Sequence, residues 1–405
     1  MSTPAPEEAD GLPPVVTGRA AGSFPRGVLL KRHPALIERV GRATPYPPDR
    51  RAALGELLRD TSETGRIAPL DPDARDAGRW REWGAPRYEG RLWTDVPFLW
   101  AESFFYRELL NAVGYFGPGP WRGIDPFAPS KRAELAGAST DSEMAALERL
   151  PTSEAERDAA LLNSSLWGNR ADLGFRLSAG DAGLGERVTG LVSDDSARLW
   201  EALGSGGAGP VCLVADNAGP ELLPDLVLAD RLLRTGRASS VVLHLKPYPY
   251  YVSDATTADA LACLERLSAG PPAAAGAGQR LRRDVTEGRL VLRAHPFSCA
   301  PLAYAEMPDD LRDDFASAKV TLMKGDLNYR RLVGDRLWPA TTPFAEATSY
   351  FPGPVAALRT LKSDVVTGLT PQTLRRLDES EGSDGSAASW RTSGTHALVQ
   401  FSAGG

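Results

Sequence analysis

Two polar side chains, Asp216 and Asn217, directly follow a short apolar run in the middle of the chain. The run, residues 211–215, reads Val-Cys-Leu-Val-Ala and predicts a buried strand. Gly219 then permits a turn, and leucines at helical spacing predict a helix over residues 221–234. Carboxylate and amide oxygens are the ligands that hard cations such as Mg²⁺ and Mn²⁺ prefer, so we expect a metal site at this strand end.

Asp254 ends a second segment of the same kind. Residues 240–246 predict a strand, two prolines follow it, and Asp254 comes just before a helix predicted over residues 257–269. Aspartate is a favoured N-cap, so Asp254 taken alone could serve only to begin that helix. Together with Asp216 and Asn217 it forms a set of two carboxylates and one amide. We expect this set to bind a divalent ion, with Mn²⁺, Co²⁺, Ni²⁺ and Mg²⁺ as candidates.

A third polar cluster follows a strand predicted over residues 320–323. It contains Lys324, Asp326, Asn328, Tyr329, Arg330 and Arg331. Charge runs of this kind often face water, but Gly325 permits close backbone approach at the strand end. Cationic donors beside a metal suit a phosphate, because phosphoryl transfer depends on neutralising the charge of the phosphate oxygens. Lys324, Arg330 and the more distant Lys362 are the candidates for this, and Asp326 is a candidate base.

Residues 359–364 form a fourth polar segment, Arg-Thr-Leu-Lys-Ser-Asp. As a helix, this segment would place Arg359 and Lys362 on one face, which by itself indicates solvent-exposed surface.

Strands and helices alternate after about residue 185, which favours a mostly parallel sheet with helices on both faces, an α/β/α sandwich. The expected organisation is a disordered lead-in (1–25), a helical subdomain (26–160) and an α/β metal-binding catalytic domain (161–405). Residues 378–394 are rich in serine, glycine and acidic residues and predict a loop before a last strand at 396–401. In such sheets ligands bind beyond the carboxyl ends of the strands.

The composition excludes several classes of protein. A net charge of -6 does not suit a general nucleic-acid binder. No apolar run approaches the roughly 20 residues that span a bilayer, and the three cysteines are too scattered for a disulfide framework or a zinc knuckle. A cytoplasmic protein without a membrane partner is therefore expected, and its oligomeric state is not set by the sequence.

Several ordered motifs together resemble those of the metal-dependent damage-control phosphatases. They are Leu-Trp-Gly-Asn-Arg-Ala-Asp (166–172), Asp-Asn-Ala-Gly-Pro-Glu-Leu (216–222), Tyr-Val-Ser-Asp (251–254), Lys-Gly-Asp-Leu-Asn-Tyr-Arg (324–330) and Arg-Thr-Leu-Lys (359–362). The last motif resembles the family's third branch, which holds eukaryotic sugar-phosphate phosphatases also described as acidic-residue methyltransferases. The similarity covers about residues 30–370, including an aromatic helical segment at 100–107.

The resemblance implies that Asp216, Asn217 and Asp254 bind the metal, with Asp216 also a candidate nucleophile. It further implies that substrate is contacted by Glu221, Asp326, Asn328, Tyr329, Arg330 and Lys362, and that the substrate is a small phosphate monoester. Pro220, Pro224 and Gly174 depart from the family's usual residues, so the preferred ester can differ from simple sugar phosphates.

Two other functions are open. One is an S-adenosylmethionine-dependent protein carboxyl methyltransferase, although the glycine-rich run at residues 204–209 precedes a strand where the common cofactor-binding fingerprint would follow one. The other is a protein that binds a phosphometabolite without turnover, against which the complete ligand set argues.

Overall fold

The computed structural model describes residues 11–168, 190–380 and 389–404. Its centre is a sheet of the strands β1 (Leu191–Asp194), β2 (Gly209–Val214), β3 (Ala238–His244), β4 (Leu290–Arg293), β5 (Val320–Lys324), β6 (Val355–Thr360) and β7 (Ala397–Ser402). The order across the sheet is β1-β7-β6-β5-β2-β3-β4. Neighbours from β6 to β4 are parallel, whereas β7 is antiparallel to β6 and parallel to β1. The predicted α/β fold with a mostly parallel sheet is confirmed.

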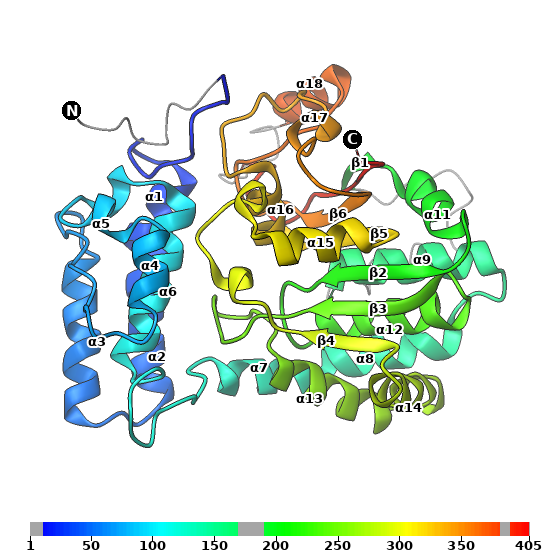
Figure 1. Ribbon diagram of the computed structural model, residues 1–405, viewed down its shortest axis with the longest axis horizontal. Coiled ribbons are helices and arrows are strands. Elements are labelled where there is room, and N and C mark those ends of the chain that lie inside the picture. The colour runs from blue at the N-terminus through cyan, green and yellow to red at the C-terminus, as the bar shows by residue number, and fades with distance from the viewer. Residues whose placement is uncertain (1–10, 169–189, 381–388, 405) are drawn as a thin grey trace.

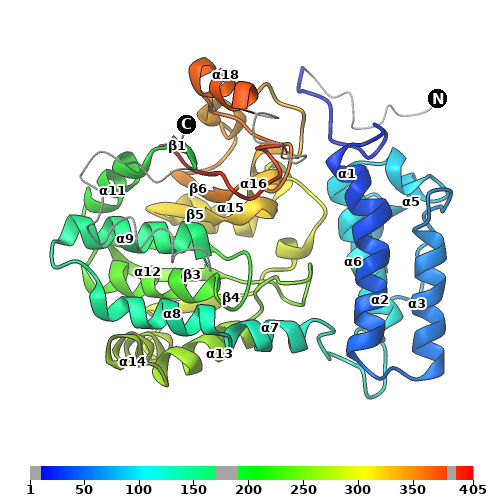
Figure 2. The same ribbon diagram turned by 180° about the vertical axis from the view of Figure 1, so that it is seen from behind.

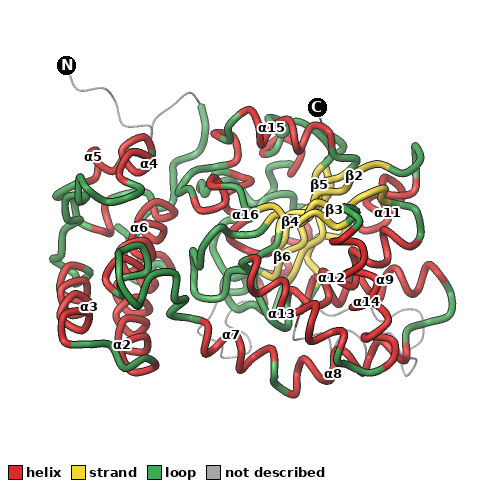
Figure 3. Tube along the Cα trace, turned by 60° about the horizontal axis from the view of Figure 1, so that its bottom comes forward, coloured by secondary structure: helices red, strands yellow, loops and turns green. Residues whose placement is uncertain are grey.

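The two faces of the sheet carry separate apolar cores because side chains alternate along each strand. In β2, Val211 and Leu213 belong to one core, and Cys212 and Val214 to the other. The first core packs under α9 (Glu154–Trp167), α11 (Ser196–Gly204), α12 (Leu222–Arg234), α13 (Thr257–Ser268) and α14 (Pro272–Thr286). The second packs under α15 (Asp309–Ser317), α16 (Gly325–Val333) and α17 (Phe344–Ala347). Figures 1 and 2 show these two layers from opposite sides, and Figure 3 shows the strands between them.

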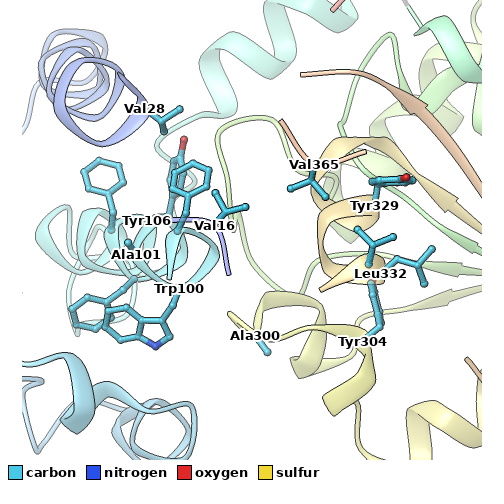
Figure 4. Close-up of a cluster of buried hydrophobic side chains, with 14 of the residues drawn as sticks. Val16, Val28, Trp100, Ala101, Tyr106, Ala300, Tyr304, Tyr329, Leu332 and Val365 are labelled. Carbon is cyan, nitrogen blue, oxygen red and sulfur yellow. The ribbon is translucent and has the colours of Figure 1, made fainter. Parts of the chain in front are cut away.

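The N-terminal part is a group of helices beside the sandwich (Figure 1). It contains α1 (Phe24–Gly27), α2 (His33–Ala43), α3 (Pro48–Asp60), α4 (Ala77–Glu82), α5 (Ala85–Tyr88) and α6 (Phe98–Ala112). Its apolar interior is continuous with one core of the sandwich. Figure 4 shows members of this cluster from both parts, Trp100 and Tyr106 on α6 and Tyr329 and Leu332 on α16. The helical part is therefore held against the α/β part by shared apolar packing.

Some boundaries differ from those expected. The helices α7 (Ala128–Leu135) and α8 (Ala138–Ala146) precede residue 161 and the longer α9 spans it, yet all three lie along the sandwich (Figure 2). Residues 1–10 of the expected lead-in lie outside the described residues. The remainder is ordered: Val15 pairs with Arg336 and Thr17 with Pro97, which ties the two parts together.

Residues 359–364 do not form a helix, so Arg359 and Lys362 do not share a helical face. Residues Val355–Thr360 form β6, an interior strand between β5 and β7. Arg359 is fully buried. Its guanidinium is satisfied there because it donates to the carbonyl oxygens of Val365 and Ser363. The predicted loop at 378–394 is replaced at its start by α18 (Pro371–Ser380), and its residues 381–388 lie outside the described part. No helix among the described residues is long and apolar enough to cross a membrane.

Candidate metal and phosphate site

The sheet changes the direction of its winding between β2 and β5. The chain moves outward from β2 to β3 and β4 on one side, and β5 lies on the other side of β2. Such a switch point opens a crevice at the carboxyl ends of parallel strands. Asp216 and Asn217 follow β2, Asp254 follows β3, and Gly325 follows β5, so the structure gathers the predicted metal ligands at this place.

Backbone pairing holds the loops after β2 and β3 together. Asn217 and Asp254 form an antiparallel bridge, and the Ala255 N–H donates to the Asp216 carbonyl oxygen at 2.8 Å. The Ser253 hydroxyl donates to Asn217 Oδ1 at 2.6 Å, which directs the amide. An amide oxygen has two lone pairs, so this bond leaves Oδ1 the capacity to bind a cation.

Gly325 fixes the Asp216 carboxylate from the other side. A Cβ at residue 325 would lie 1.8 Å from Asp216 Oδ2 and 2.1 Å from its Cγ. The φ of Gly325 is +82°, a left-handed conformation that side chains disfavour. Only glycine permits this approach, as the sequence indicated for the end of this strand.

The site concentrates negative charge. Asp216 and Asp254 are 8% and 2% exposed. Burial raises the pKa of Asp216 well above its usual value, and the carboxylates of Asp254 and Glu221 raise it further. Burial also raises the pKa of Asp254, against the opposing effect of the Lys246 ammonium.

A cation would balance these carboxylates. Within the described residues, neither Asp216 nor Asp254 forms an ion pair with a lysine or arginine. Buried carboxylates without a cationic partner are typical of metal sites. The described part of the chain contains no group of three histidine, cysteine, aspartate or glutamate side chains that could hold a metal. A metal site at this place would therefore have to use the Asn217 amide as a third ligand.

Glu221 and Lys362 lie at the rim of this cluster. The Asn217 amide donates to Glu221 Oε2 at 2.8 Å, and Lys362 Nζ lies 3.8 Å from Glu221 Oε1. The Lys362 side chain is 48% exposed. Its ammonium therefore lies where an anionic ligand can reach it from solvent.

Lys324 lines a small pocket that also includes Asp216 and Glu221. Its ammonium is buried and pairs with Asp225 on α12 at 2.8 Å. It also donates to the hydroxyl and the carbonyl oxygen of Ser165 on α9. This pairing ties β5 to two helices and partly neutralises the lysine beside the predicted ligands.

Asp326 is bound to Arg359. The guanidinium of Arg359 donates to Asp326 Oδ1 at 2.8 Å through Nε, and the Lys362 N–H donates to the same oxygen at 3.2 Å. Burial alone would raise the pKa of Asp326, but Arg359 and Arg330 outweigh it and hold the pKa below its usual value. The carboxylate thus stays ionised and positions the Lys362 backbone.

The structure does not bring Asn328, Tyr329 and Arg330 to the Asp216 cluster. The Asn328 amide donates to the carbonyl oxygens of Ala215 and Lys324, and the Tyr329 hydroxyl donates to Gln400. These buried contacts favour a structural role over the predicted contact with substrate.

Arg330 likewise points into the protein. It forms ion pairs with Asp335 at 2.7 Å and with Glu102 of α6 at 2.8 Å. Its guanidinium also lies 4.5 Å from the centre of the Phe98 ring. Arg331, the next residue, donates to three backbone carbonyl oxygens and is fully buried. Both arginines therefore hold neighbouring segments together.

Sequence reasoning missed the groups that hold the Asp254 loop. Lys131 of α7 donates to the Asp254 carbonyl oxygen at 2.8 Å and pairs with Asp125 and Asp259, each at 3.0 Å. The Tyr251 N–H donates to Asp254 Oδ2 at 3.0 Å. Lys131 precedes Asp254 by more than 120 residues, and no local pattern in the sequence signals such a pairing.

Residues 169–172 of the motif Leu-Trp-Gly-Asn-Arg-Ala-Asp, and Gly174, lie outside the described residues.

Comparison of the sequence with known proteins shows the family to which the chain belongs. The damage-control phosphatase ARMT1-like domain matches residues 28–377. Damage-control phosphatase ARMT1 of Danio rerio is 29% identical over 450 residues, covering 98% of each chain. The Homo sapiens protein of that name is 31% identical over 341 residues, covering 76% of this chain and 75% of its own.

The Mus musculus protein is 30% identical over 415 residues, covering 92% of this chain and 91% of its own. A solved DUF89 family protein from Pyrococcus horikoshii is 16% identical, with a TM-score of 0.48, covering 86% of this chain and 93% of that one. The chain belongs to the damage-control phosphatase ARMT1-like family. This confirms the resemblance and the phosphatase class predicted from sequence.

Proposed function

We propose that the chain hydrolyses a small phosphate monoester at the Asp216 cluster, with a divalent ion held by Asp216, Asn217 and Asp254. The observation that carries the proposal is the pair of buried carboxylates without a cationic partner among the described residues. A bound divalent ion supplies Lewis acidity toward a phosphoryl oxygen. Mn²⁺, Co²⁺, Ni²⁺ and Mg²⁺ are the candidates, and a cytoplasmic location stays a prediction.

The surrounding residues divide the remaining work. Lys362 is exposed at the rim and faces Glu221, so we assign this pair to binding the ester. Asp326 holds the Lys362 backbone and is kept ionised by Arg359, which favours a positioning role over that of a base. Lys324 lines the small pocket beside Asp216 and Glu221. Its ammonium is partly neutralised by Asp225 but still contributes positive potential there.

The position of the glycine-rich run at the amino end of β2 favours the phosphatase over the methyltransferase. The glycine-rich run at residues 204–209 ends where β2 begins, whereas Asp216 follows the carboxyl end of that strand. The run therefore lies away from the carboxylates and does not form the loop that a cofactor of that kind requires.

Phosphate release from a panel of sugar phosphates tests the proposal. Chelator-treated protein should be inactive, and adding Mn²⁺, Co²⁺, Ni²⁺ or Mg²⁺ should restore turnover. Asp254→Asn should abolish activity, while Asp284→Asn should retain it, because Asp284 is an equally buried carboxylate on the distant α14. Undiminished turnover in excess chelator would contradict the metal requirement. Labelled methyl transfer to a glutamate-rich protein, measured in parallel, would support the alternative activity.

A further inference from the structure

The loop that carries Asp254 is attached to the helical part through Tyr251. The Tyr251 N–H donates to Asp254 Oδ2 at 3.0 Å, and its hydroxyl donates to Glu102 Oε2 on α6 at 3.2 Å. Its ring stacks on Tyr106, also on α6, with ring centres 4.5 Å apart and an interplanar angle of 22°. One residue therefore contacts both the predicted ligand and α6.

Glu102 is itself held by α16. Arg330 of α16 pairs with Glu102 at 2.8 Å and with Asp335 at 2.7 Å. Asp335 in turn accepts the Leu99 N–H at 3.1 Å, so α6 and α16 are joined at two points. All of these polar groups are buried. A buried network in which every member is bonded is rigid, because any shift leaves a charge without its partner.

The same helix fixes the other carboxylate. α16 begins at Gly325, whose backbone lies against Asp216, and five residues later it carries Arg330. Asp216 is thus located directly by α16, and Asp254 is located through Arg330, Glu102 and Tyr251. The two loops are already paired directly, through the Asn217–Asp254 bridge and the Ala255 N–H. The contacts through the helical part add a second path that constrains the separation of the two carboxylates.

We propose that Tyr251 is a positioning residue, through which the helical part sets the affinity of the Asp216, Asn217 and Asp254 site for divalent metal. The proposal rests on the metal site of the proposed function. Groups that orient the metal-binding side chains raise the affinity for the ion. Without them, a mobile side chain must be ordered when the ion binds, which costs free energy. Loss of such a partner typically weakens metal binding by roughly 10–100-fold.

Tyr251→Phe tests the link with a matched control. It removes the hydroxyl that donates to Glu102 but keeps the ring and the backbone N–H. Tyr250→Phe removes a neighbouring buried hydroxyl that also bonds α6, through Ser103, but Tyr250 does not donate to Asp254. Tyr250→Phe loses its contact with Ser103, whereas Tyr251→Phe loses the bond to Glu102 and a longer contact with Ser103 at 3.4 Å. Both variants therefore weaken contact with α6, but only Tyr251 is also bonded to Asp254.

Binding of Mn²⁺ to the metal-free full chain is measured directly, for example by electron paramagnetic resonance of the free ion, without substrate. We expect Tyr251→Phe to raise the Kd for Mn²⁺ about tenfold, with Tyr250→Phe close to the unaltered protein. The kcat at saturating Mn²⁺ should change little in both variants. Glu102→Gln approaches the link from α6 and should weaken Mn²⁺ binding in the same direction.

Equal Kd values for Tyr251→Phe and the unaltered protein would overturn the proposal, as would equal weakening in both tyrosine variants. Thermal unfolding of each metal-free variant identifies any loss of fold, and Glu102→Gln then provides the deciding Kd. If the unaltered protein binds no Mn²⁺ and is active without metal, the proposed function itself fails, and this inference fails with it.

Discussion

Replacing Gly325 by alanine tests whether backbone contact fixes the Asp216 carboxylate. The new Cβ would lie 1.8 Å from Asp216 Oδ2, whereas ordinary contacts begin at 3.4 Å, so the atoms must separate by about 1.6 Å. A misplacement of roughly 1 Å in a catalytic constellation costs about 100-fold in rate. We expect Gly325→Ala to lower kcat/KM for phosphate release at least about 100-fold, equivalent to about 2.7 kcal/mol.

Gly334→Ala is the matched control because it lies at the other end of the same helix. Its φ of +88° is close to the +82° of Gly325, so both variants lose roughly 1–2 kcal/mol of folding free energy to the left-handed backbone. The nearest atom to a Cβ at Gly334 is 3.6 Å away, on the flexible side chain of Arg336. Gly334→Ala should therefore lose stability but keep its activity.

Phosphate release at saturating Mn²⁺ and urea unfolding are measured for both variants. The reasoning is refuted if Gly325→Ala keeps more than about a tenth of the activity, or if Gly334→Ala loses as much activity as Gly325→Ala. A large loss of stability without loss of activity in Gly325→Ala would show that the loop yields and that Asp216 is held by other contacts.

Two further predictions concern stability. Lys131→Met leaves Asp125 and Asp259 without their shared cation. Because these carboxylates are 19% and 17% exposed, we expect a loss of roughly 1–3 kcal/mol, measurable by urea unfolding, and an unchanged midpoint would contradict this. Burial lowers the pKa of His244 to about 4, so the unfolded chain binds this proton first as the pH falls below roughly 6.5. Stability is therefore retained above that pH and decreases toward pH 4, by about 2 kcal/mol between pH 7 and pH 5 for this residue, and His244→Phe should reduce that slope. Burial of His33, whose pKa is also lowered, adds to the effect in the same direction.

Elements with a strong local pattern were predictable from the sequence. The apolar runs that form β2, β3 and β5 are short and continuous because helices cover both faces of the sheet. The strand β6 was missed because Arg359, which normally indicates surface, is buried there against Asp326 and two carbonyl oxygens. A pattern of hydrophobicity cannot register a charge whose partner is supplied by tertiary structure.

The same reasoning applies to the site. The clustering of Asp216, Asn217 and Asp254 was predictable because the carboxyl ends of parallel strands in one sheet lie at the same side of it. Local sequence does not reveal whether a charged residue after such a strand faces the crevice or the interior. Lys362 reaches the rim, whereas Arg330 turns inward to Glu102, more than 220 residues earlier in the chain. Position at a strand end therefore predicted which residues lie together better than it predicted the directions of the charged side chains around them.

The position of β7 has a consequence for synthesis of the protein. β7 pairs with β1 on one side and β6 on the other, and every residue of β7 is buried. β1 is therefore made about 200 residues before the strand that it pairs with. Until then β1 lacks its partner strand β7 and β6 is an exposed edge. An exposed edge strand has unpaired backbone groups that can pair with another chain. The newly made chain thus passes through a stage in which β2 to β6 are assembled and one edge must be kept from other chains.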